Sequence, residues 1–253
     1  MSNTYYLYHH GIKGQKWGVR RFQNKDGSLT NAGKNRLDKG SKINRISTVA
    51  ETTPHKERTY VTINDHDNDY YKEHMTKFRR QNNINRKIYE VQYTNVKDLV
   101  YTDHDKQVEE FVKLYSDMKV KVCTDMAKES VHRIIGHTPN LNNAYDKSGV
   151  DYFYNKYANY TVDELKKEGY QEFIRTYSDI PVSKIYQKRL KKQGYNAIID
   201  DNDVLYNPMD TFNPEKSLIV FEPKKNLKVV SSKELTDEEY NSALKRNESR
   251  RKK

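Results

Sequence analysis

Residues able to do chemistry are scattered along the chain and do not form a familiar site pattern. The sequence contains no phosphate-binding loop, no Gly-x-Gly-x-x-Gly, no Cys-x-x-Cys and no nucleophile elbow. Residues 65–69 (DHDND) imitate the start of a calcium loop. The sixth position is Tyr70, where the sharp turn requires Gly, and the twelfth is Thr76, where a bidentate Glu is required. Residues 9–10 are adjacent histidines with no Cys or acidic residue near them. We therefore expect no metal site.

One basic, glycine-rich segment has the most specific pattern. Residues 9–33 (HHGIKGQKWGVRRFQNKDGSLTNAG) combine one tryptophan, spaced glycines and paired arginines. The segment resembles a short tag found near the ends of many tailed-bacteriophage and prophage structural proteins. Dense glycine disfavours a long helix, and the apolar residues are too few for the segment to fold alone. We expect it to dock on a partner such as a capsid or portal protein, the alternative being a disordered leader. The expected docking residues are Trp17, Lys13, Lys16, Arg20 and Arg21.

A second, weaker resemblance covers about residues 45–235. It rests on Arg45 in an early strand, on RTYVT at residues 58–62, and on LKKQGYNAII at residues 190–199 followed by LIVFEP at residues 218–223. These segments are similar to ADP-ribosyltransferase-like domains of phage and toxin proteins. That family has a split, mostly antiparallel sheet with flanking helices, and the cleft in the sheet holds NAD in a bent conformation. The resemblance therefore implies NAD as the cofactor.

The same resemblance implies roles for individual side chains. Arg45 would contact the dinucleotide, because an Arg binds phosphate bidentately, and Ser47 and Thr62 would be further cofactor contacts. Tyr60 or Thr62 would support the nicotinamide ribose. A glutamate at a late strand would hold the ribose 2′-hydroxyl and stabilise the oxocarbenium-like transition state.

The late glutamate departs from the family pattern. The family has Glu-x-Glu or Gln-x-Glu beside an apolar strand, whereas this chain has Glu215-Lys-Ser217 before LIVF. Ser217 stands where the catalytic Glu is expected, so either Glu215 acts in a shifted register or the site does not transfer ADP-ribose. Each residue also has a structural interpretation: Arg45 pairs with an acid at the sheet edge, Tyr60 is in the core, and Glu215 is a solvated residue at the start of a strand.

The elements that would position these residues follow from hydrophobic periodicity and capping signals. Strands are expected at residues 43–47, 59–63, 88–91, 196–199, 218–221 and 227–230. Helices are expected at residues 31 onward (short, capped by Thr30), 69–81, 105–135, from the capping box at Thr161, 180–193 and 236–244, with residues 137–160 irregular. Strands followed by helices and then by strands indicate an α+β fold.

Charge divides the chain into three parts. The net charge of +11 is concentrated at the two ends, with +7 in residues 1–42 and +5 in residues 243–253. We expect a docking tag at residues 1–42, an ADP-ribosyltransferase-like domain at 43–242 and a basic disordered tail at 243–253. The single Cys123 excludes an intramolecular disulfide, and no apolar run is long enough to span a membrane. We expect the protein in the virion and the host cytoplasm.

Three functions remain open. The first is a virion-associated phage protein that docks through its tag and carries the ADP-ribosyltransferase-like domain. The second is an active mono-ADP-ribosyltransferase that modifies a host protein with NAD. The third is a sequence-independent nucleic-acid binder that uses both basic ends and is driven by counterion release.

Overall fold

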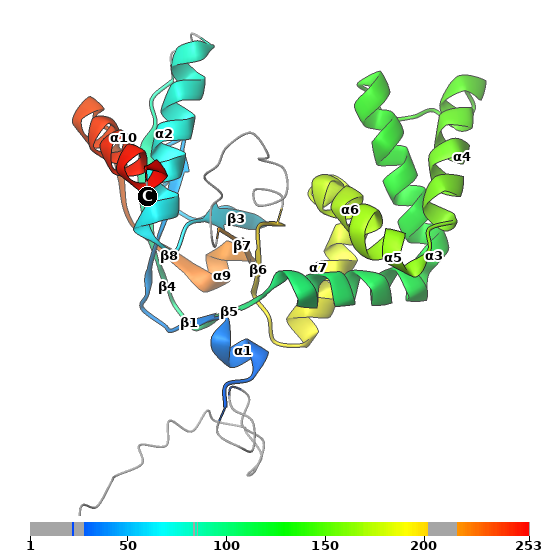
Figure 1. Ribbon diagram of the computed structural model, residues 1–253, viewed down its shortest axis with the longest axis horizontal. Coiled ribbons are helices and arrows are strands. Elements are labelled where there is room, and N and C mark those ends of the chain that lie inside the picture. The colour runs from blue at the N-terminus through cyan, green and yellow to red at the C-terminus, as the bar shows by residue number, and fades with distance from the viewer. Residues whose placement is uncertain (1–21, 23–27, 83, 85, 202–216, 253) are drawn as a thin grey trace, which may run out of the picture.

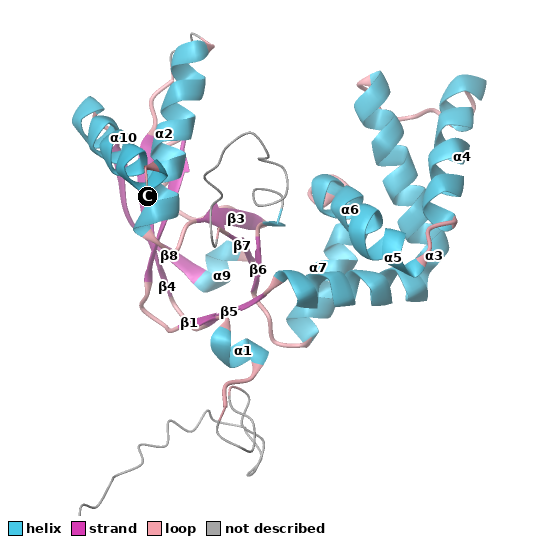
Figure 2. Cartoon of the chain, viewed as in Figure 1, coloured by secondary structure: helices cyan, strands magenta, loops and turns pink. Residues whose placement is uncertain are grey.

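The computed structural model describes residues 22, 28–82, 84, 86–201 and 217–252 of the 253-residue chain. Figure 1 shows a β-rich half, with two small sheets, beside a lobe made of helices. Figure 2 shows that the described strands all lie in the β-rich half of the molecule, and that helices α2 and α10 cover this half on one side. The fold is mixed α+β, as the sequence predicts.

The larger sheet has five strands in the order β1-β5-β6-β7-β3. Every neighbouring pair is antiparallel except β5 and β6, which are parallel. The strands are β1 (Arg36–Leu37), β3 (Arg58–Val61), β5 (Leu99–Thr102), β6 (Ala197–Ile199) and β7 (Leu218–Phe221). Since parallel strands require a long crossover connection, the helical lobe lies between β5 and β6 in the sequence.

The smaller sheet is antiparallel and has the order β2-β4-β8. Its strands are β2 (Lys42–Ser47), β4 (Tyr89–Asn95) and β8 (Leu227–Glu234). Among the described residues, a single bridge between Asn44 of β2 and Thr62, which follows β3, joins the two sheets. An apolar cluster with members from both sheets, including Ile43, Val61 and Val91, packs between them.

The helical lobe begins with a long helix, α3 (His104–Ile135), that is kinked at Met118. Asp103 caps its first turn by accepting from the Lys106 N–H, and Gly136 ends it in the left-handed conformation at φ 77°. The other elements are α4 (Ala144–Ala158), α5 (Val162–Glu164), the π-helix η1 (Leu165–Gly169), α6 (Tyr170–Thr176) and α7 (Val182–Lys192). Their apolar faces form one cluster, which also takes in Ile198, Ile219 and Phe221 of the larger sheet.

Two helices from distant parts of the sequence pack together on the smaller sheet (Figure 1). Helix α2 (Asp65–Gln81) is capped by Asn64, and α10 (Asp237–Arg251) begins with a complete capping box. Two short helices, α1 (Asn31–Lys34) and α9 (Pro223–Asn226), lie at the larger sheet and before β8. No helix in the described part of the chain has the length and apolar character needed to cross a membrane.

The last part of the expected tag is built onto the domain. Strand β1 lies within residues 1–42, yet it pairs with β5 as the edge of the larger sheet. Thr30 caps α1, as expected, and its N–H donates to the Phe22 carbonyl at 3.1 Å. Gly33 packs against that carbonyl so closely that a Cβ atom would lie 2.2 Å from the oxygen. Only glycine fits there.

Two expectations about secondary structure are wrong. Residues 137–160 were expected to be irregular, but α4 forms there because Asn143 caps it and its Val150 and Tyr157 pack in the lobe cluster. Residues 243–253 were expected to be disordered, but α10 continues to Arg251. The physical reason is burial: Ala243 and Asn247 are fully buried where α10 packs on α2.

Candidate functional site

A row of polar residues crosses four strands where the two sheets meet. Asn44 and Thr62 exchange backbone hydrogen bonds at 2.9 and 2.7 Å, and the Thr62 hydroxyl donates to the Asn44 carbonyl at 3.2 Å. Continuing the β3–β7 register by one residue places Ser217 opposite Thr62. The Asp200 N–H donates to the Ser217 carbonyl at 2.8 Å. Residues directly opposite each other point to the same face, so these four side chains share one face.

Ser217 is the residue at the position expected for the family's catalytic glutamate. It is buried immediately before β7, and its hydroxyl donates to the Tyr71 hydroxyl of α2 at 3.2 Å. A serine at this place supplies a hydroxyl and no carboxylate.

Arg45 and Ser47 lie on the opposite face of β2 from this row, because successive residues of a strand alternate. The Arg45 Nε atom pairs with Glu51 Oε1 at 3.4 Å, and the half-exposed His55 ring contacts the same oxygen at 3.2 Å. The Tyr93 hydroxyl donates to the other Glu51 oxygen. Burial and this carboxylate raise the pKa of Tyr93. Arg45 thus pairs with an acid, as its structural interpretation predicts.

Tyr60 lies on the Thr62 side of β3. It is 38% exposed and borders a small cavity of about 30 Å³ together with Tyr177 of the helical lobe and Asp201. The structure therefore brings Tyr60 and Thr62 to one face and places Arg45 and Ser47 on the other. The remaining predicted site residues lie outside the described part of the chain: Glu215, Trp17, Lys13, Lys16, Arg20 and Arg21.

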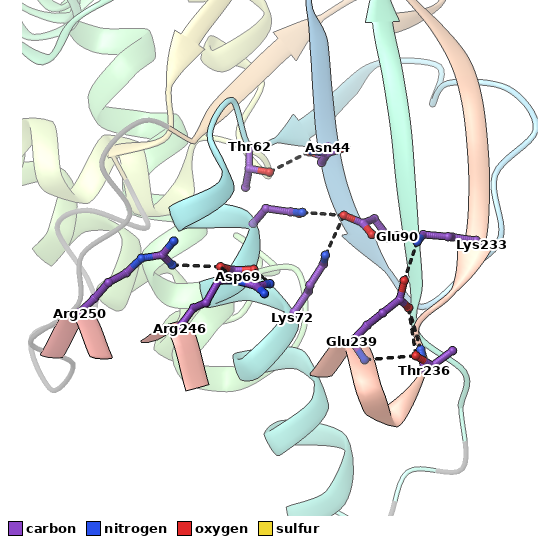
Figure 3. A network of polar contacts seen from close by, with 11 residues as sticks. Asn44, Thr62, Asp69, Lys72, Glu90, Lys233, Thr236, Glu239, Arg246 and Arg250 are labelled. Carbon is purple, nitrogen blue, oxygen red and sulfur yellow. Dashed lines mark hydrogen bonds and ion pairs between the residues drawn. The ribbon is translucent and has the colours of Figure 1, made fainter. Parts of the chain in front are cut away.

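A cleft of about 560 Å³ extends from Asn44 between the smaller sheet and helices α2 and α10. Figure 3 shows the bridge between Thr62 and Asn44 at one end of this network and the charged side chains of α2, α10 and the sheet beyond it. The lining residues are Asn44, Asp65, Asn68, Asp69, Lys72, Glu90, Gln92, Ser231, Lys233, Arg246 and Arg250.

The charges in the cleft compensate one another across the three elements. Lys72 of α2 pairs with Glu90 of β4 at 2.9 Å, and the Asn68 amide donates to the same carboxylate at 2.6 Å. Arg246 donates to both oxygens of Asp69 at 2.7 Å (Figure 3). Arg250 adds a third hydrogen bond to Asp69 at 3.0 Å. These contacts join α10 to α2 and α2 to the sheet.

These ion pairs decide the protonation of the buried acids. Burial acts to raise the pKa of Asp69, but the hydrogen bonds and charges of Arg246 and Arg250 outweigh it, so the pKa is lowered. Burial likewise opposes ionisation of Glu73, and hydrogen bonds from Lys77, Asn247 and other donors lower its pKa. Both groups are carboxylates at neutral pH.

A second titratable cluster was not foreseen from the sequence. His104, at the start of α3, contacts buried Asp201 through Nδ1 at 3.2 Å, and the buried Tyr170 hydroxyl donates to the same carboxylate oxygen. The Asp201 hydrogen bond raises the pKa of His104. The sequence feature that could have predicted this cluster is the pair Asp200-Asp201 directly after an apolar strand, because buried polar groups at such a place must find partners.

The described residues contain no group of three His, Cys, Asp or Glu side chains placed to hold a metal ion. The arrangement can form hydrogen bonds through amides and hydroxyls and can neutralise charge locally. No protein-family model matches the chain, and neither does any curated protein or solved structure.

Proposed function

We propose that this chain is a virion-associated phage protein that docks through its N-terminal tag and carries a non-transferring ADP-ribosyltransferase-like domain. The described strands form two mostly antiparallel sheets. Among the described strand pairings, only the bridge between Asn44 and Thr62 joins these sheets, and this arrangement supports the comparison with a split sheet. The tag resemblance at residues 9–33 supports the phage association and the capsid or portal partner.

One observation favours a non-transferring domain over an active enzyme. Transfer of ADP-ribose requires a cation on the phosphates, a hydroxyl under the nicotinamide ribose and a carboxylate at the ribose, all around one bound dinucleotide. Here Arg45 lies on the face of β2 opposite Thr62 and is paired with Glu51. Ser217, on the Thr62 side, provides no carboxylate.

An NAD transfer assay tests this part of the proposal. The full chain is incubated with labelled NAD and host lysate, beside Arg45→Ala and Glu215→Gln. We expect no labelled host protein above the background of lysate alone. Label transfer that depends on either residue would overturn the proposal and establish the active mono-ADP-ribosyltransferase with a host protein substrate.

The docking role needs a separate experiment, for which the structure indicates the correct truncation. Deleting residues 1–42 would remove β1 from the sheet, so the deletion should end at residue 21, before Phe22. The truncated chain should keep its melting temperature and lose co-purification with capsids. A full-length variant with Trp17→Ala should weaken capture, whereas Tyr152→Ala, an exposed aromatic on α4, should not. Undiminished capture by the truncated chain would refute docking through the tag.

The DNA-binding alternative receives less support from the C-terminal end than its charge suggests. Arg246 and Arg250 are paired with Asp69, and Arg251 with Glu73. Cations that already have acidic partners release fewer counterions from DNA, so we expect a shallow salt dependence. A steep fall in duplex DNA binding between low and moderate salt would favour the alternative.

A further inference from the structure

The cleft between the smaller sheet and helices α2 and α10 has a floor of unpaired neutral groups. Asn44 lies opposite Gln92, and Gln92 lies opposite Ser231, so the three residues form one row across β2, β4 and β8. All three line the cleft. Within the described part of the chain their side chains make no hydrogen bond, unlike Asn68, Asp69 and the other charged lining residues except Asp65.

The charges around this row are already compensated by protein groups. Lys72 and Lys233 contact Glu90, and Lys233 also pairs with Glu239. The two arginines share Asp69, and the charge of Asp65, the remaining acid of the lining, interacts electrostatically with Arg246. A ligand with a net charge would have to break these pairs or lose its hydration without a new partner, which is costly. The cleft is therefore matched to a ligand without net charge.

We infer that this cleft binds a neutral, hydroxyl-rich ligand of monosaccharide size. Each carboxamide offers two N–H donors and an acceptor oxygen, and a serine hydroxyl can both donate and accept a hydrogen bond. Sugar hydroxyls also donate and accept, so they complement such a row. The volume of about 560 Å³ falls within the range of small-molecule sites. The described lining residues include no aromatic ring, which disfavours a stacked nucleobase. This inference does not depend on the function proposed above.

Saturation-transfer NMR on the full-length chain tests the inference. The probes are D-ribose, D-glucose, D-galactose and N-acetyl-D-glucosamine, each at about 10 mM, tenfold above a Kd of ~1 mM. We expect saturation transfer to at least one of them. Gln92→Leu, which keeps the side-chain size and removes the amide, should weaken that binding about fivefold for each hydrogen bond lost. Ser231→Ala is a milder second variant at an exposed position.

The controls separate a specific site from a general polar surface. Asn155→Leu removes an exposed amide on α4, away from the cleft lining, and should leave sugar binding unchanged. Far-UV circular dichroism confirms that each variant is folded. The inference is overturned if no sugar in the panel receives saturation, or if Gln92→Leu and Ser231→Ala both bind like the wild type. Tighter binding of inorganic phosphate than of every sugar would also overturn it.

Discussion

Asp69→Asn should destabilise the protein by loosening α10 from α2. Asp69 is buried and accepts three hydrogen bonds from guanidinium groups, two from Arg246 and one from Arg250. An asparagine keeps one acceptor oxygen, but its amide NH₂ group replaces the other oxygen and cannot accept a hydrogen bond from the guanidinium groups. Hydrogen bonds to charged groups contribute about 1.5–3 kcal/mol each. Because half of the Arg246 side chain is exposed, solvent screening reduces that contribution. We expect a loss of about 2–3 kcal/mol in the free energy of unfolding.

Urea denaturation followed by circular dichroism at neutral pH measures this loss. The expected change corresponds to a melting temperature lower by roughly 4–12 °C for a chain of this size. The matched control is Asp151→Asn, at an exposed position of α4, which should change stability by less than about 0.5 kcal/mol. Equal stability of the two variants would refute the reasoning.

The same pairing predicts how stability depends on acid. The pKa of Asp69 is lowered below its ordinary value of 3.8, so the stabilisation is present above that value and is lost as the pH falls through the lower folded pKa. The difference between wild type and Asp69→Asn should therefore shrink only in strong acid.

Three further predictions concern other parts of the molecule. Ending the chain after Leu244 should cost roughly 3 kcal/mol or more, since it removes Arg246, Arg250 and Arg251, which pair with Asp69 and Glu73 of α2; a disordered tail would give no change in the urea midpoint. Gly33→Ala should cost about 1–3 kcal/mol in urea denaturation, because the new methyl group meets the Phe22 carbonyl; wild-type stability would contradict that close approach. The pKa of His104 is raised above 6.5 by Asp201, so its contribution is complete below 6.5 and is lost as the pH rises through the folded pKa. His104→Ala should therefore make the melting temperature depend less on pH between about pH 6 and pH 9. An unchanged pH dependence would show that the His104–Asp201 pair does not cause it.

The sequence predicted six of the eight described strands because their signal is local, but it missed β1 (Arg36–Leu37) and β5 (Leu99–Thr102). Runs such as LIVF at residues 218–221 combine β-branched and aromatic residues, and the structure places a strand at the same residues. The capping box at Thr161 was confirmed for the same reason, since a cap depends on residues three positions apart.

Features that depend on distant partners could not be predicted in this way. The arginines of α10 look like a solvated basic tail until Asp69 and Glu73 are known to lie beneath them. The side of β2 on which Arg45 lies follows only from the bridge between Asn44 and Thr62, which fixes the parity between two strands. The alternation of residues sorts one strand into two faces, but it does not show which of these faces lies on the same side of the sheet as a given face of the next strand.

The contact between α2 and α10 also has a consequence for how the chain is made. Asp69 and Arg246 are 177 residues apart. At about 5–20 residues per second, a ribosome needs roughly 10–35 s to produce Arg246 after Asp69. During that interval the carboxylates of α2 have left the ribosome without the arginines that neutralise them. The α2 side of the smaller sheet can therefore close only after Arg246 and Arg250 have left the ribosome, and a nascent chain that stalls before that point leaves Asp69 without these partners.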